Sequence, residues 1–123
     1  MKDFRTLTVW DRAHALALAV YKATEPFPKC ELYGLTSQIR RAGASVPTNI
    51  AEACGRAGRG DFHRFLSTAM GSAVELEYLL LLAKDLGLLA EELYRKLNQQ
   101  TLEVQRMLGA LIRKVEAGLK VAR

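Results

Sequence analysis

Apolar residues recur every three or four positions along most of the chain, which is the spacing of one face of an α-helix. No long stretch alternates apolar and polar residues, and β-branched residues are sparse, so strands are not expected. The pattern divides into four segments, at about residues 8–24, 30–56, 61–86 and 89–117. Long helices with short connections predict an all-α, antiparallel, up-and-down four-helix bundle. We expect a single domain over residues 1–123.

The expected helix ends follow from residues that cap or interrupt helices. Thr6 or Thr8 can cap the first helix, and Asp61 can cap the third. Gly87 suits the left-handed conformation in which many helices end. Pro47 lacks the amide hydrogen that a helix interior needs, so we expect the second helix to be kinked near Pro47, or to break there and restart with Ser45 as its cap.

The third segment carries more apolar surface than a bundle core requires. The stretch "YLLLLA", Tyr78 to Ala83, is apolar nearly all round a helix, and small residues precede it from Ser67 to Ala73. A second apolar face needs a second partner surface, and small side chains let helices approach closely. We therefore expect the chain to associate with itself. This stretch is the longest apolar run of the chain, and Lys84 and Asp85 end it. A membrane span needs about 20 apolar residues, so no membrane partner is expected.

The composition is globular, and the chemistry of the side chains adds little sign of catalysis. Half of the residues are hydrophobic and 25% are charged, which argues against disorder. Cys30 and Cys54 form no CxxC pattern, and the first residues carry charges where a signal peptide is apolar. We expect a cytoplasmic protein with reduced thiols. Cys54 lies on an apolar stripe, where a packed, inert thiol is favoured over a nucleophile.

Metal and nucleotide motifs are incomplete. A di-metal bundle site uses Glu-x-x-His motifs, but neither His14 nor His63 follows a glutamate at that spacing. The glycines of "NIAEACGRAGRGD", residues 49–61, follow a helix and match neither the dinucleotide nor the P-loop spacing. A turn before the Asp61 cap explains them, and explains the Arg-Gly-Asp tripeptide without an adhesion role. We expect no catalytic residue, no metal, no cofactor and no enzyme activity.

Basic residues give the chain its clearest functional signal. The net charge is +5 with a pI near 9.5, which favours an anionic partner such as nucleic acid. Residues 38–64 hold five arginines against two carboxylates, and residues 106–123 hold five cations against one. Solvated helix faces are the alternative explanation for both regions. The candidate phosphate-binding residues are Arg40, Arg41, Arg56, Arg59, Arg64, Arg113 and Lys114.

Aromatic side chains do not favour base stacking. The candidates lie on expected core stripes: Trp10, Tyr21, Tyr33, Phe62 and Phe65. We therefore expect recognition of the phosphate backbone and of shape rather than of base sequence.

Several short motifs together resemble a known family. They are Leu7 with Val9-Trp10, Tyr21, Phe27-Pro28, Glu31 with Tyr33-Gly34-Leu35, Gln38 with Arg40-Arg41, Ser45-Val46-Pro47 with Asn49-Ile50-Ala51-Glu52, Gly55-Arg56, Phe65-Leu66 through Ala69, Gly71-Ser72 and Glu75-Leu76. As a set they resemble the four-helix-bundle proteins encoded within 23S rRNA intervening sequences, and the related accessory protein of diversity-generating retroelements. One departure is Ala53, where that family usually has glycine.

The resemblance implies an antiparallel four-helix bundle that assembles as a homopentamer and carries a basic surface. It implies RNA or DNA as a partner, no established enzyme activity, and, through the retroelement relatives, a reverse transcriptase as a further partner. Two hypotheses remain open at this point. One is a non-enzymatic homo-oligomer that binds nucleic acid through phosphate contacts; the other is a protein-interaction scaffold without direct nucleic-acid binding.

Overall fold

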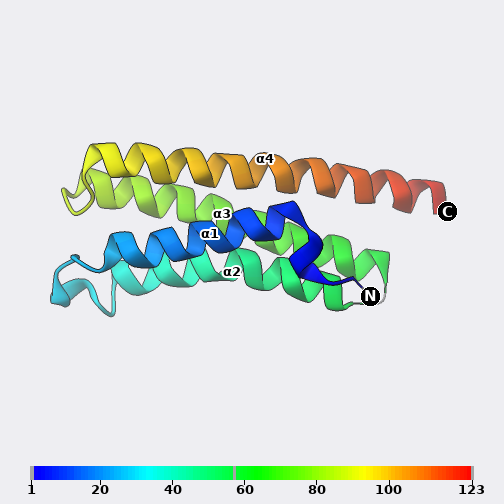
Figure 1. Cartoon of the computed structure of the whole chain (residues 1–123), viewed down its shortest axis with the longest axis horizontal. Helices are drawn as coiled ribbons and strands as arrows, with labels where there is room; N and C mark the ends of the chain where they lie inside the picture. Colours follow the sequence, from blue (N-terminus) through cyan, green and yellow to red (C-terminus); the bar gives the residue numbers. More distant parts are fainter. Residues whose placement is uncertain (1, 57, 123) are drawn as a thin grey trace.

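The computed structural model describes residues 2–56 and 58–122, with side chains as far as residue 119 (Figure 1). These residues form four α-helices: α1 (Thr8–Thr24), α2 (Leu35–Gly55), α3 (Arg59–Asp85) and α4 (Glu91–Ala122). Two short 3-10 helices, η1 (Phe4–Thr6) and η2 (Lys29–Glu31), precede α1 and α2. Each long helix packs against two others, since α1 and α3 both contact α2 and α4. The predicted all-α four-helix bundle is confirmed.

The core runs the length of the bundle and combines large aliphatic side chains with alanines. Its largest fully buried members are Leu16, Ile39, Ile50, Leu66, Leu76, Leu80, Leu97 and Leu108. Burial of one such side chain stabilises the fold by about 1.5–3 kcal/mol. Between them, alanines such as Ala13, Ala69 and Ala73 are completely buried. Small side chains at these positions let neighbouring helices lie close together.

Helix ends differ from the sequence expectations in their caps more than in their positions. Residue 8 begins α1 as expected, but Leu7 occupies the cap position, and the hydroxyl of Thr6 donates to the carbonyl oxygen of Asp3 at 2.7 Å. The prediction of a threonine cap is therefore wrong. The second helix begins at Leu35, because η2 and a turn occupy the first residues of the expected segment.

The start of α3 is also earlier than expected. Gly58 takes the cap position and Asp61 lies inside the first turn, so the prediction that Asp61 caps this helix is wrong. A carboxylate in the first turn still favours the helix, because it faces the positive end of the helix dipole. Gly87, after the end of α3, has a φ of +78°, which confirms the predicted left-handed stop.

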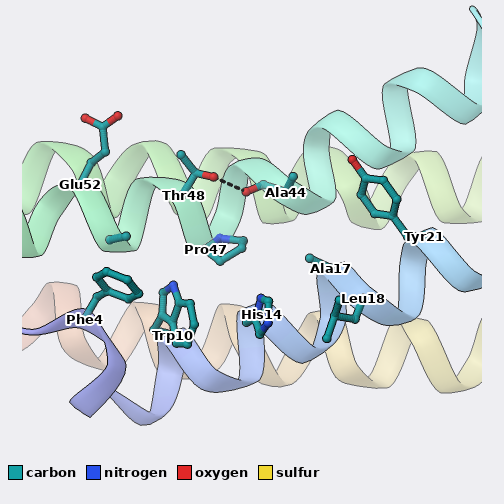
Figure 2. A pocket seen from close by; sticks show the side chains of 11 residues that line it. Phe4, Trp10, His14, Ala17, Leu18, Tyr21, Ala44, Pro47, Thr48 and Glu52 are labelled. Atoms are coloured by element: carbon teal, nitrogen blue, oxygen red, sulfur yellow. Dashed lines mark hydrogen bonds between the residues drawn. The ribbon is translucent and has the colours of Figure 1, made fainter.

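Pro47 lies within a helix that continues through it. The expected break is absent from α2, and the ribbon in Figure 2 changes direction beside Ala44 and Pro47. Side chains in this turn bond to backbone oxygens: the Thr48 hydroxyl donates to Ala44 at 2.8 Å, and the Asn49 amide donates to Ser45 at 2.8 Å. Ser45 caps no helix start, since its hydroxyl pairs with that of Ser72 on α3 at 2.8 Å.

α3 is long and apolar enough to cross a membrane, by length and composition alone. The length of the longest uninterrupted apolar run therefore underestimates how apolar this helix is. Core helices of bundles meet the same measure, and α3 contacts both α2 and α4. Its buried face comprises Leu66, Ala69, Ala73, Leu76, Leu79, Leu80 and Ala83.

Candidate nucleic-acid interface

The predicted phosphate-binding residues separate into two groups in the structure. Arg40 and Arg41 lie in the first half of α2, whereas Arg56 and Arg59 lie where α2 ends and α3 begins. The fifteen residue steps from Arg41 to Arg56 span roughly 22 Å along the helix axis. Arg113 and Lys114 lie in the second half of α4, which runs toward the end of the bundle that holds the N-terminus of α3 (Figure 1).

Arg40 has partners within its own fold. Its Nε donates to the hydroxyl of Thr24 at 2.8 Å, and its Nη2 donates to the carbonyl oxygen of Tyr21 at 3.2 Å. The guanidinium also lies 4.9 Å from the centroid of the Tyr21 ring. These contacts join α2 to the last turn of α1, where unpaired carbonyl oxygens favour a cation. The geometry assigns Arg40 a structural role.

Aromatic side chains near Arg40 are more accessible than the sequence indicated. Tyr33 is 94% exposed and Tyr21 is 45% exposed, so the prediction that both belong to the core is wrong. Both line an open depression of about 710 Å³ together with Arg40 and Arg41. The apolar spacing predicts a helix from about residue 30, but α2 begins only at Leu35. Tyr33 lies in the turn before it, where its side chain is exposed.

The second group surrounds a cavity of about 430 Å³ at the end of the bundle. Its described lining includes four cationic side chains, Lys2, Arg56, Arg59 and Lys114, and no carboxylate. They come from the N-terminal segment, the end of α2, the start of α3 and the second half of α4. Apolar residues complete the wall: Ala53, Cys54, Phe62, Leu111 and Val115.

Each cation at the cavity except Lys114 has a recorded contact that restricts it. Arg59 donates through Nη1 to the carbonyl oxygen of Gly118 at 3.2 Å. Arg56 contacts Glu52 at 3.2 Å and lies 4.8 Å from the Phe65 ring centroid. The ammonium of Lys2 lies 5.9 Å from the Phe62 ring centroid, and its backbone amide donates to the carbonyl oxygen of Cys54 at 3.1 Å.

The remaining predicted cations lie outside this lining. Arg64 is exposed, contacts Asp61 at 3.4 Å and stacks on Phe65 at 4.5 Å. Arg113 is also exposed, one residue from Lys114. Two cations that contributed to the basic C-terminal region, the Lys120 side chain and Arg123, lie outside the described residues.

No histidine or carboxylate belongs to the described lining of the cavity, and His63 and Glu116, each next in sequence to a lining residue, pair with each other at 2.8 Å. Burial raises the pKa of the Cys54 thiol, which the nearby charge of Lys2 opposes, so this cysteine stays a neutral thiol rather than a reactive thiolate. Both cysteines are free thiols. Within the part of the chain that the structure describes, no group of three or more His, Cys, Asp or Glu residues could hold a metal ion.

An apolar groove of about 660 Å³ runs between α1 and α2 (Figure 2). Figure 2 shows Phe4, Trp10 and His14 on one wall and Pro47 and Thr48 on the other. The Trp10 and His14 rings are stacked, with centroids 5.0 Å apart. Trp10, which was expected in the core, is half-buried: it packs against the core and also forms a wall of this groove.

The comparison with protein families decides the family. A model of the 23S rRNA-intervening sequence protein family matches residues 5–110. The chain belongs to this family. Among solved structures, a protein of unknown function from the S23 ribosomal protein family of Bacteroides thetaiotaomicron is similar, with a TM-score of 0.78 and 29% identity. That match covers 85% of this chain and 98% of the other. No curated protein matches.

Lys2 is the cavity residue that sequence reasoning missed. It lies before the first predicted helix, and the apolar periodicity of the helices does not predict where such a segment lies in the fold. The Lys2–Cys54 backbone hydrogen bond, which brings it to the cavity, joins residues far apart in the sequence. Asn49 donates a hydrogen bond to the Ser45 carbonyl oxygen near Pro47, whereas Glu52 is exposed and contacts Arg56 on the surface.

Proposed function

We propose that this family member is a non-enzymatic, cytoplasmic protein that binds nucleic acid through phosphate contacts at the basic end of its bundle. The observation that carries the proposal is the convergence of Lys2, Arg56, Arg59 and Lys114 on one cavity. Each phosphate that a cation neutralises releases counterions, so binding strengthens with each contact and weakens with salt. Arg64 and Arg113 extend the basic surface beside the cavity, while Arg40 is largely occupied within the fold.

We further propose that the protein works as a homo-oligomer, in line with the pentamer that the family resemblance implies. Two apolar surfaces support self-association. One is the groove between α1 and α2; the other is a ridge on α3 formed by Val74, Tyr78 and Leu81, which are spaced to share one helix face. Because groove and ridge are different surfaces, a ridge-into-groove contact is heterologous, and such a contact generates a ring when its rotation closes.

Fluorescence anisotropy with labelled structured RNA and labelled duplex DNA tests the nucleic-acid proposal. The wild-type protein is expected to bind at low ionic strength and to lose affinity as salt rises. The double variant Arg59→Gln/Lys114→Gln should lower the salt slope by about two units. A matched double variant at exposed positions elsewhere, Lys22→Gln/Lys96→Gln, changes the charge equally and should keep the wild-type slope.

The outcomes separate the two hypotheses. Absence of salt-sensitive binding to both nucleic acids overturns the nucleic-acid proposal. If sedimentation still shows an oligomer under those conditions, the scaffold hypothesis, including a reverse transcriptase as partner, is favoured instead. Tyr78→Glu, at a side chain that is 59% exposed, should dissociate the oligomer while leaving the helical content unchanged. A wild-type protein that sediments as a monomer overturns self-association.

A further inference from the structure

We propose that the cavity at the end of the bundle takes a terminal phosphate monoester of a nucleic-acid strand, in preference to phosphodiesters within the strand. This inference deepens the proposed function and rests on it. The cavity is lined by Lys2, Arg56, Arg59 and Lys114, from four different parts of the chain. No periodic pattern along one helix produces such a convergence, so it is a property of the tertiary structure.

The charge balance at the cavity favours a multiply charged anion. No carboxylate belongs to its described lining, and Glu52, which contacts Arg56, lies outside it. Because Arg56 is paired with Glu52, the positive charge at the cavity comes mainly from Lys2, Arg59 and Lys114, and an anion there lowers their mutual repulsion. A phosphate monoester carries about −1.5 to −2 charges at pH 7, whereas each internal phosphodiester carries one. Several cations around one small volume therefore discriminate in favour of a strand end.

Three of the four cations at the cavity, all but Lys114, have contacts that restrict them before any ligand arrives. The Arg59 fork is fixed by the Gly118 carbonyl oxygen through one of its nitrogens, which leaves its other donors free for an anion. Aromatic rings restrict Lys2 and Arg56 at 5.9 and 4.8 Å from their centroids. Such restriction lowers the entropy lost on binding. α3 begins here as well, since Gly58 and Arg59 both line the cavity and the first amides of a helix lack helical partners.

The size and the wall of the cavity fit the nucleotide attached to such a phosphate. A volume of about 430 Å³ falls within the range of roughly 300–1,000 Å³ for small-molecule sites. Beside the cations, the wall is apolar through Phe62, Leu111 and Val115, which can cover a sugar or base. A strand end enters a concave site from one side, whereas an internal phosphate must pass the strand through it in both directions.

The test compares single-stranded oligoribonucleotides of one sequence that end in a 5′-phosphate, a 3′-phosphate or hydroxyls only. Fluorescence anisotropy of the wild-type protein should show about tenfold tighter binding of a phosphate-ended strand than of the hydroxyl-ended strand. Arg59→Gln and Lys114→Gln should each reduce this ratio toward one. Arg64→Gln, which removes an equal charge beside the cavity but not within its lining, should weaken all three strands and keep the ratio.

The failures of the two proposals are distinguishable. Equal, salt-sensitive affinity for all three strands overturns the terminal-phosphate site and leaves the nucleic-acid function standing. Absence of binding to any strand overturns both. Adenosine monophosphate serves as the competitor: if it displaces the phosphate-ended strand as well as unlabelled strand does, the site belongs to a free nucleotide and the strand-end proposal is wrong.

Discussion

Two arginines in separate parts of the bundle, Arg40 near the start of α2 and Arg59 at the start of α3, show why the surroundings of a cation matter more than its presence. Arg40 has three contacts to the last turn of α1, so its charge and donors are largely used by the fold. Arg59 has one recorded hydrogen bond and shares a cavity with three other cations. From the sequence alone, the two residues were equal candidates for phosphate binding. The structure separates a residue that stabilises the bundle from one that is available to an anion.

The largest expected effect is on stability, from Arg40→Ala. This change removes hydrogen bonds from a charged donor to Thr24 and Tyr21 and should lower the free energy of unfolding by about 1–3 kcal/mol. Denaturant unfolding followed by circular dichroism measures it. The comparison is Arg41→Ala, at an exposed neighbour, which should stay within about 0.5 kcal/mol of wild type. Equal losses from the two variants would contradict the structural role of Arg40.

Lys114→Ala should have a smaller effect on stability than Arg40→Ala, and its main effect should be on nucleic-acid affinity. The side chain is exposed, so stability should change by less than about 0.5 kcal/mol. Nucleic-acid affinity should nevertheless fall, with a salt slope reduced by about one unit. Unfolding and anisotropy measured on the same preparations give both values. A Lys114 variant that unfolds more easily than the Arg40 variant would reverse the contrast on which the site rests.

The smallest expected effect concerns Cys54 in the cavity wall, and the accessibility of its thiol tests whether that wall is closed. Cys30 is exposed and Cys54 is buried, so a thiol reagent should modify Cys30 quickly and Cys54 slowly. Because burial raises the pKa of Cys54, its contribution to stability is full below the unfolded pKa and is lost as pH rises through the folded pKa. In Cys30→Ser, unfolding midpoints should therefore fall gradually above about pH 8.5. Fast labelling of Cys54 at neutral pH would show an open wall.

The helical pattern predicted most of the fold because its spacing is local. The bounds of α1 and the stop at Gly87 follow from apolar spacing and backbone preference, and both are confirmed. Caps were predicted less well, because several residue types can occupy a cap and the choice depends on how the chain enters the helix. Thr6 bonds to Asp3 in a preceding 3-10 turn, which leaves Leu7 at the cap of α1.

The candidate site was only half predictable for a related reason. Arg56, Arg59 and Lys114 could be predicted from the sequence because residue type identifies a cation. Which of the basic residues share a surface could not be predicted from it. Lys2 is held at the cavity by a backbone hydrogen bond to Cys54, and no pattern in the neighbouring sequence predicts that contact. Tyr33 was assigned to the core because it continued an apolar spacing, yet it lies in the turn before α2.

By itself, the sequence determined that this chain is a helical bundle of a recognisable family with an excess of arginine and lysine. Those properties depend on residue type and short-range spacing, which the chain carries whether folded or not. Only the tertiary structure decided which charges are used within the fold and which face a common cavity. The physical reason is that the availability of a cation depends on the partners that other helices bring within a few ångströms. Arg40 meets carbonyl and hydroxyl oxygens of α1 there, whereas Arg59 meets one carbonyl oxygen and lines a cavity with three other cations.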